Sequence, residues 1–442
     1  MRNSVITEPT RIPRAEHSIS RSQISQGTLK VLYTLKDAGY EAYMVGGGVR
    51  DLLAGLEPKD FDIATNAHPE QVKAIFRSCR LVGRRFVICH VRHGNEISEV
   101  TTFRGPITDE HERDDTGRIL NDNEYGTLEE DAFRRDFTIN ALYYDIRDFS
   151  IIDFADGLAD MKRGVIRLIG DPELRYREDP VRMLRAVRIA NKMSFKLDEP
   201  TAKPIKKLAP LLAEIPAARL FDEVLKVMLN KQAVNNFLQL RDLGLFAQLF
   251  PQTEKAIEDA RSYNFVVGAL LNTADRMKND ASVSPAFFYA ALLWPPVVAR
   301  MRDLIVRQNV HPNVASVQAC EEVLAMAVQR IAIPKRFSLP MREIWQLQPR
   351  FEMRKGGRAK RLLTHPRFRA AYDFLLLRAQ AGEAPKELAD WWTQAQVGAQ
   401  LPPVREESVD SGDVTGDSEV GAPVRKRRRR GGRRNKKPST PA

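Results

Sequence analysis

The chain has 442 residues, 43% of them hydrophobic, which is enough for two or three globular domains. It has no apolar run of about 18 residues that would predict a membrane span, and its three cysteines lack metal-site spacing and are too few for a disulfide framework, which favours a reducing, cytoplasmic setting. The net charge is +12, but residues 425–437 hold 10 Lys and Arg and no acid, leaving 59 basic against 57 acidic residues elsewhere. The basic character is therefore predicted to lie in one tail, which either attracts polyanions or is simply a solvated end.

The first half of the chain predicts short strands alternating with helices. Residues 1–25 are polar and contain prolines, which predicts a flexible N-terminal arm. A helix is expected over 28–40, a buried strand over 42–45, a glycine turn at 46–48 that opens a further helix, and a second strand over 60–65.

The next segments continue this pattern. Pro69 suits the first turn of a helix. Residues 104–130 are polar and aperiodic, which is typical of a functional or disordered loop. DGLAD at 156–160 indicates a turn. Further strands are expected over 84–91, 95–103 and 150–154.

Helical patterns dominate from about 172 to 395, with breaks near prolines. We therefore predict an α/β head followed by an all-α neck and body and a disordered tail. The expected boundaries are 1–25 for the arm, 26–170 for the head, 171–235 for the neck, 236–398 for an RNA-binding body and 399–442 for the tail. Within the body, segments 334–351 and 365–380 mix Lys and Arg with apolar spacing, which suits either an RNA path or a plain amphipathic surface. The tryptophans of the body are expected mostly in its core rather than stacked on bases: Trp294, Trp345, Trp391 and Trp392.

Asp60 and Asp62 are the first candidates for chemistry. Two positions apart on a strand, their carboxylates would project to the same side. Their repulsion would be relieved by a divalent cation, and Mg²⁺ prefers such oxygen ligands. The same spacing also occurs in surface turns, so the pair alone is a weak signal.

The glycine turn is the second candidate. Gly46, Gly47 and Gly48 lack Cβ atoms, so a phosphate could approach the backbone closely, and Arg50 would add a positive charge. This is neither a Walker loop nor a dinucleotide fingerprint. A plain turn would explain the glycines equally well.

In combination these segments are specific. VGGGVRDLLAGLEPKDFDIAT is followed in order by EVTTFR, RRDFTINALYYD, DGLADMKRGVIRLIG and EDPVRMLRAVRIA. This series resembles the polymerase-β-like nucleotidyltransferase superfamily, and within it the class II branch of tRNA nucleotidyltransferases and bacterial poly(A) polymerases. The resemblance is strong over residues 25–235 and weaker to about 395.

The resemblance implies roles in the head. Asp60 and Asp62 would bind the catalytic Mg²⁺ ions and Asp136 would lie in or beside the active centre. The triphosphate would be contacted by Gly46, Gly47 and Arg50. Arg135 could donate to phosphate or ribose oxygens, although Arg134 and Arg135 would equally suit a surface ion-pair cluster. Glu99 is either a third carboxylate near the metals or the partner of an arginine.

The segment 178–190 is expected to read the base. Asp179 followed by proline has the form of an N-cap, yet the resemblance implies that Asp179 and Arg182 contact the Watson–Crick edge. Arg185 and Arg188 would then serve phosphate and ribose. Three unpaired arginines on a buried helix would require an anion or a solvent channel.

Two segments favour the poly(A) branch: LVGRRFVICHV at 81–91 and IPAARLFDEVLKVML at 215–229. The expected activity is template-independent transfer of AMP from ATP to RNA 3′ ends, in mRNA processing and RNA decay, with RNA-decay proteins as possible partners. The alternatives are a CCA-adding tRNA nucleotidyltransferase and a catalytically silent RNA-binding relative. The tail would bind RNA through Arg427, Arg428, Arg429 and Arg430.

Overall fold

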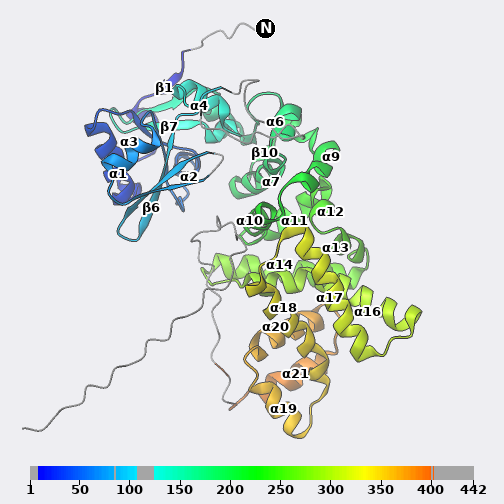
Figure 1. Cartoon of the computed structure of the whole chain (residues 1–442). Helices are drawn as coiled ribbons and strands as arrows, with labels where there is room; N and C mark the ends of the chain where they lie inside the picture. Colours follow the sequence, from blue (N-terminus) through cyan, green and yellow to red (C-terminus); the bar gives the residue numbers. More distant parts are fainter. Residues whose placement is uncertain (1–7, 84–85, 107–123, 400–401, 403–442) are drawn as a thin grey trace, which may run out of the picture. The chain divides into compact units, whose positions relative to one another are not determined.

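The computed structural model describes residues 8–83, 86–106, 124–399 and 402. Its head, which we define as the described residues up to 170, contains an eight-stranded sheet in the order β1-β8-β7-β2-β3-β6-β5-β4 (Figure 1). Adjacent strands are antiparallel except β3 and β6, which are parallel. The strands are β1 Thr10–Ile12, β2 Ala42–Val45, β3 Asp62–Thr65, β4 Cys79–Val82, β5 Ile88–His93, β6 Glu96–Thr102, β7 Leu142–Asp145 and β8 Ile151–Asp153.

Both faces of the sheet are buried because side chains alternate along each strand. On β2, Met44 packs with Ile63 in one core, whereas Tyr43 and Val45 pack with Tyr143 in another. The short helices of the head are α1 Gln26–Asp37, α2 Gly47–Leu53, α3 Pro69–Ile75, α4 Leu128–Arg134 and α5 Gly157–Arg163, with 3₁₀ turns η1 Arg14–Glu16, η2 Arg21–Gln23 and η3 Thr138–Asn140.

The remainder is helical, which confirms the predicted fold class. The neck (171–235) and the body (236–399) share a continuous core. The neck helices are α6 Pro172–Glu178, α7 Val181–Met193, α8 Glu199–Ala202, α9 Ile205–Leu208, η4 Ala209–Glu214 and α10 Ala217–Met228, and α11 Ala233–Asp242 leads into the body. The body helices are α12 Leu245–Leu249, α13 Pro251–Ala256, α14 Ala260–Lys278, α15 Pro285–Leu292, α16 Trp294–Gln308, α17 Pro312–Ile331, α18 Lys335–Leu347, η5 Gln348–Glu352, α19 Gly356–Leu363, α20 Phe368–Gln380 and α21 Lys386–Ala395.

The N-terminal segment differs from the predicted loose arm. From residue 8 onward it is built into the head: β1 pairs with β8, and Ile19 and Ile24 are buried. These isoleucines are too widely spaced for a periodic signal, so the polar residues around them dominate the sequence pattern. Residues 1–7 lie outside the described part of the chain.

Three further elements were not expected. β4 and β5 form a hairpin where a single strand is predicted. DGLAD begins α5 rather than a simple turn, because Asp156 takes a left-handed conformation with φ 59° just before the helix. A two-residue strand, β10 (Lys196–Leu197), follows the last predicted strand and pairs in parallel with β9 (Val165–Ile166).

Three tryptophans of the body are buried, in agreement with the core interpretation. The indole N–H groups of Trp294, Trp345 and Trp392 donate to protein oxygens. Trp391 is half-buried. No helix of the described residues is long and apolar enough to cross a membrane. Residues 107–123 of the predicted loop and Arg427–Arg430 of the tail lie outside the described residues.

Candidate active site

The glycine turn lies directly beside Asp62. The register of β2 and β3 sets Val45 opposite Asp62, and Gly46 follows with a φ of 76° at the N-cap of α2. A Cβ on Gly46 would lie 3.5 Å from Asp62 Oδ2 and 3.6 Å from Arg135 Nη1. Glycine therefore leaves open a space, bounded by a carboxylate and a guanidinium, that any other residue would fill.

Asp60 and Asp62 do not share a strand as predicted, because β3 begins only at Asp62. Asp60 is exposed in the preceding loop and Asp62 is half-buried. Burial, then the facing Glu99 of β6, raise the pKa of Asp62 to about 6; Asp60 adds to the rise, whereas Arg135 and Arg185 oppose it. The predicted strand is present but begins two residues later than expected, at Asp62; the two aspartates are nevertheless close enough to repel one another.

Of the three acidic residues Asp60, Asp62 and Glu99, only the two aspartates suit a divalent cation as ligands. Glu99 Oε1 lies 3.6 Å from His90 Nε2, so its ion-pair partner is a histidine instead of the arginine considered from the sequence. In the described part of the chain, no group of three or more His, Cys, Asp or Glu is arranged to hold a metal ion. Asp60 and Asp62 nevertheless supply hard oxygen ligands, and a divalent cation would offset the negative charge that raises the pKa of Asp62.

Arg135 is fixed beside Asp62 by the buried Asp131. Its Nε and Nη2 donate to Asp131 Oδ2 at 3.1 and 2.8 Å, and Nε also donates to the hydroxyl of Tyr143 at 2.9 Å. Burial works against the charged form, but Asp131 raises the pKa of Arg135 above its usual range. Asp131 also accepts from Arg104 Nε at 3.2 Å. Arg135 thus remains charged at the glycine turn.

Arg134, by contrast, does not belong to the site or to a surface cluster. It is buried, and its Nη1 donates to the carbonyl oxygen of Gly105 at 2.9 Å. Arg134 is the last residue of α4, whereas Arg135 is its C-cap with an extended backbone, so the two neighbours have different surroundings, which sequence adjacency alone does not reveal.

Asp136 holds Arg185 of the neck. Its Oδ2 accepts from Arg185 Nε at 2.7 Å and lies 2.6 Å from Arg185 Nη2 in an ion pair. Its Oδ1 accepts from Asn140 Nδ2 at 2.9 Å and from the Phe137 amide at 2.8 Å. Burial favours the protonated acid, but Arg185 and these hydrogen bonds hold the pKa of Asp136 well below its usual range. Both carboxylate oxygens are occupied, so Asp136 positions Arg185 beside the active centre.

Arg50 is not the free cation that the sequence predicts. Its Nε and Nη2 donate to Asp51 Oδ1 at 3.0 and 2.7 Å, and its Nη1 donates to Asn140 Oδ1 at 2.6 Å. Lys192, near the end of α7, donates to the other oxygen of Asp51 at 2.6 Å. Asp51, overlooked in the sequence, therefore joins the helix of the glycine turn to α7. Gly47 begins that helix, and a Cβ there would lie 3.5 Å from Arg50 Nη2.

The two base-reading candidates are held by separate ion pairs. Asp179 lies between α6 and α7: it is the C-cap of α6, and its Oδ1 accepts from the Val181 amide at 3.3 Å, as expected of an N-cap for α7. Its Oδ2 accepts from Arg219 Nη2 of α10 at 2.7 Å. Arg182 Nη1 donates to Glu178 Oε2 at 2.9 Å and to the carbonyl oxygen of Arg175 at 2.7 Å. Within the described chain, Nη2 of Arg182 forms no hydrogen bond. The sequence pattern gave no indication of these contacts of Arg219 and Glu178.

Of the three arginines predicted to be unpaired on α7, only Arg188 lacks an ion-pair or hydrogen-bond partner in the part of the chain that the structure describes. Its buried Nε has no hydrogen-bond partner among the described residues. Burial, then nearby Arg185, lower the pKa of Arg188, while Glu223 opposes them. A buried donor without a partner is costly, and an anionic ligand would satisfy it.

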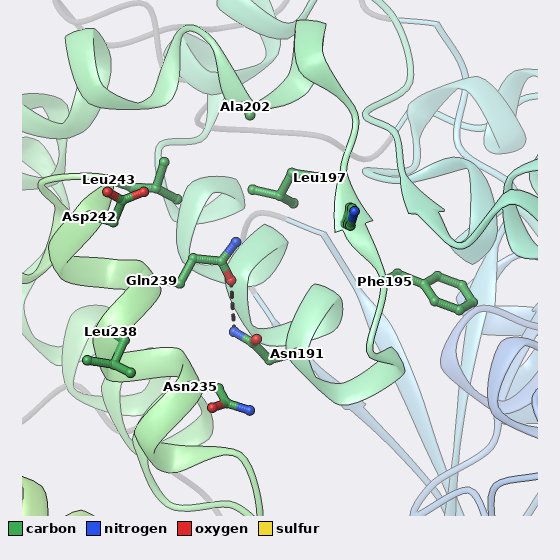
Figure 2. A pocket seen from close by; sticks show the side chains of 10 residues that line it. Asn191, Phe195, Leu197, Ala202, Asn235, Leu238, Gln239, Asp242 and Leu243 are labelled. Atoms are coloured by element: carbon green, nitrogen blue, oxygen red, sulfur yellow. Dashed lines mark hydrogen bonds between the residues drawn. The ribbon is translucent and has the colours of Figure 1, made fainter.

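A separate pocket of about 500 Å³ contains none of these candidate residues. It lies between the end of α7, β10 and α11, where Asn191 Nδ2 donates to Gln239 Oε1 at 2.8 Å (Figure 2). Phe195 and the exposed Leu238 also line it. The candidate site is therefore defined by its charged residues and not by this cavity.

Three models of one protein family match the chain. Residues 42–167 match the poly A polymerase head domain, and residues 194–257, which include most of the pocket lining, match the probable RNA and SrmB-binding site of polymerase A. Residues 308–435 match the polymerase A arginine-rich C-terminus. The matches follow the order of head, neck and body.

Individual relatives agree. A poly(A) polymerase I of Salmonella typhi is 48% identical over 401 residues, covering 88% of this chain and 86% of that protein. A CCA-adding enzyme of Lactobacillus helveticus is 40% identical over 240 residues, covering only 51% of this chain and 58% of that protein. The solved structure of a Thermotoga maritima CCA-adding enzyme complexed with tRNA has a TM-score of 0.56 at 19% identity, over 88% of this chain and 85% of that one, and supports the fold alone.

Proposed function

The chain belongs to the family of bacterial poly(A) polymerases and is a polynucleotide adenylyltransferase, and we propose that ATP binds where Gly46, Asp62 and Arg135 meet. The enzyme transfers AMP from ATP to RNA 3′ ends without a template and releases pyrophosphate. The observation that carries the site assignment is the space at Gly46, which lies between Asp62 Oδ2 and Arg135 Nη1. A triphosphate next to a divalent cation needs such neighbours: a carboxylate for the metal ion, a guanidinium for the phosphate oxygens, and a backbone without a Cβ.

In this proposal Asp60 and Asp62 hold Mg²⁺. Held there, Mg²⁺ would contribute two-metal chemistry, namely activation of the attacking 3′ hydroxyl and stabilisation of the leaving oxygen. Arg135 and the unpaired Arg188 donate to phosphate oxygens and compensate the charge of the triphosphate. Glu99, engaged with His90, stays outside the ligand set.

Positioning residues complete the site. Asp136 orients Arg185 toward ribose or phosphate, and Arg50 acts through Asp51 on α2 instead of contacting phosphate itself. Asp179 and Arg182 face the base. Arg219 fixes the side chain of Asp179, and Glu178 fixes that of Arg182. The two side chains therefore present one fixed pattern of hydrogen-bond acceptors and donors, which suits a single base better than several.

The alternative, CCA addition, is less supported because the CCA-adding relative covers about half of the chain. An extension assay separates the two. The purified full-length chain receives a generic RNA with Mg²⁺ and either ATP or CTP. We expect long tails with ATP and little extension with CTP. Incorporation of C confined to tRNA ends would support the alternative, and no extension with any nucleotide would support a silent RNA-binding relative.

We also propose the wider setting. Head, neck and body divide near residues 170 and 235, and the basic residues Arg427–Arg430 bind RNA. The free cysteines Cys79, Cys89 and Cys320 suit a reducing cytoplasm, where RNA-decay proteins are candidate partners.

A further inference from the structure

A second concentration of positive charge lies within the folded body. Residues 335–369 hold 11 Lys and Arg against two Glu, a net charge of +9. The near balance of charge outside the tail conceals this segment, because acidic residues elsewhere in the chain offset it. The tail is therefore not the single basic region of the protein.

Part of this charge is neutralised by neighbours and part is not. Arg342, Arg367 and Arg369 each pair with a nearby acid. The other eight are exposed and form no ion pair with any residue that the structure describes. Five of these lie in or just before α19, and we call them the α19 surface: Arg354, Lys355, Arg358, Lys360 and Arg361.

Helix α19 is anchored to the body by the apolar side chains of its inner face. Its Ala359 and Leu362 are buried in a core that includes Phe351, Phe368 and Trp392. Because those residues occupy the inner face, Arg358 and Arg361 project from the outer face of the helix, which Figure 1 shows next to α21.

Such an arrangement has an electrostatic cost. Arg358 and Arg361 are three residues apart on one helix, so their charges repel and weaken it. A bound polyanion would reverse this effect. Exposed cations on and just before a packed helix, with no ion-pair partner among the described residues, suit a flexible chain with regularly spaced phosphates better than an isolated acid.

We propose that the α19 surface binds the phosphate backbone of single-stranded RNA, independently of base sequence. The proposal rests on the proposed function in taking RNA as the substrate. It adds a fixed binding surface within the folded body to the predicted contacts of the tail. Its five cations would each displace counterions from the RNA on binding.

The test measures binding without ATP or Mg²⁺, so that catalysis plays no part. Full-length protein carrying Arg358→Gln, Lys360→Gln and Arg361→Gln is compared with the unaltered chain by fluorescence anisotropy on a labelled oligoadenylate over a salt series. We expect weaker binding, and a slope of log affinity against log salt that is smaller by about 2, since each neutralised phosphate of a single strand contributes about 0.7 to the slope.

Two control variants test whether the effect is specific to the charge of the α19 surface. Lys30→Gln, Lys162→Gln and Lys278→Gln remove the same charge from exposed positions outside the α19 surface, and the slope should stay unchanged. Arg358→Lys with Arg361→Lys keeps the charge and should keep the slope. The proposal is overturned if circular dichroism shows that the triple α19 variant is folded and its salt slope for RNA equals that of the unaltered chain. It is overturned also if, with that slope unchanged, the variant loses only its binding to an acidic protein. Failure of the unaltered chain to extend RNA with ATP would count against the proposed function and not against this binding surface.

Discussion

Arg185 and Arg358 belong to helices of the same chain, but their surroundings are opposite. Arg185 donates a hydrogen bond to the half-buried Asp136 and forms an ion pair with it, and its orientation is thereby fixed. Arg358 is exposed and unpaired within the described structure. At the junction of head and neck almost every arginine has a carboxylate partner, whereas on the α19 surface no acid among the described residues is paired with the cations.

The contrast shows how one residue type serves two purposes. A buried pair holds a group at a defined position but is expensive to break, because either partner left alone is an uncompensated charge. An exposed cation contributes little to stability, and its attraction for a polyanion depends on salt. The following experiments test this division, in order of their expected effect on addition of the first AMP.

The largest effect is expected from Asp62→Ala. Loss of a metal ligand beside the glycine turn should lower AMP transfer by roughly 10³-fold or more, since metal ions supply several kcal/mol of transition-state stabilisation. Single-turnover extension of a short RNA measures this rate, and the RNA affinity should be retained. Asp60→Ala should behave alike. Glu57→Gln, an exposed acid nearby, is the control. A parallel loss of RNA binding would contradict a purely catalytic role.

Asp131→Asn tests the cost of a buried partner. The substitution leaves Arg135 and Arg104 with a neutral neighbour, and we expect the free energy of unfolding to fall by about 3–5 kcal/mol. Urea denaturation followed by circular dichroism measures the change. Asp37→Asn, at the exposed end of α1, should stay within about 0.5 kcal/mol of the unaltered protein. Equal stability of the two variants would mean that Asp131 is not essential to the junction.

The sequence predicted contacts between residues that lie close together in one motif, but it did not predict ion pairs between residues far apart in the chain. The strand, glycine turn and second strand lie within 24 residues of each other, so the proximity of Gly46 and Asp62 was expected from the order of elements. Asp51 and Lys192 are 141 positions apart, and Asp179 and Arg219 are 40 apart, so neither pair produces a periodic signal. As a result, arginines that seemed unpaired have partners.

In the body, the net charge taken over the whole chain concealed a local feature. A charge balance taken over hundreds of residues hides a segment of 35 residues with a net charge of +9. Hydrophobic spacing correctly predicted that Trp345 and Trp392 are core residues, but it gave no information about which of the surrounding cations lack acids. That distinction depends on tertiary structure.

Arg182→Ala should alter base choice more than it alters stability. Its Nη2 is the group left available to a base, and a good base-edge contact contributes about 1–3 kcal/mol of discrimination. We expect the ratio of ATP to GTP or CTP incorporation to fall by about tenfold or more, together with slower transfer. Competition assays with mixed nucleotides measure the ratio. Arg177→Ala, on exposed α6 surface, is the matched control. An unchanged preference for ATP would remove Arg182 from base recognition.

Removal of residues 421–442 should have the smallest effect on the first AMP addition, because none of the proposed residues of the active site lies in this segment. It deletes 10 basic residues, so RNA affinity should fall, and the salt slope should decrease by about 0.7 for each phosphate that the tail neutralises. Thermal unfolding should be unaffected. If charge alone matters, a chain with Arg427–Arg430 changed to lysine will keep the slope of the unaltered protein.

Combining the truncation with the α19 triple variant then decides whether the two basic regions act separately. Additive losses of affinity indicate that both regions bind one RNA independently, whereas no further loss indicates that the tail binds only where the α19 surface already holds the strand.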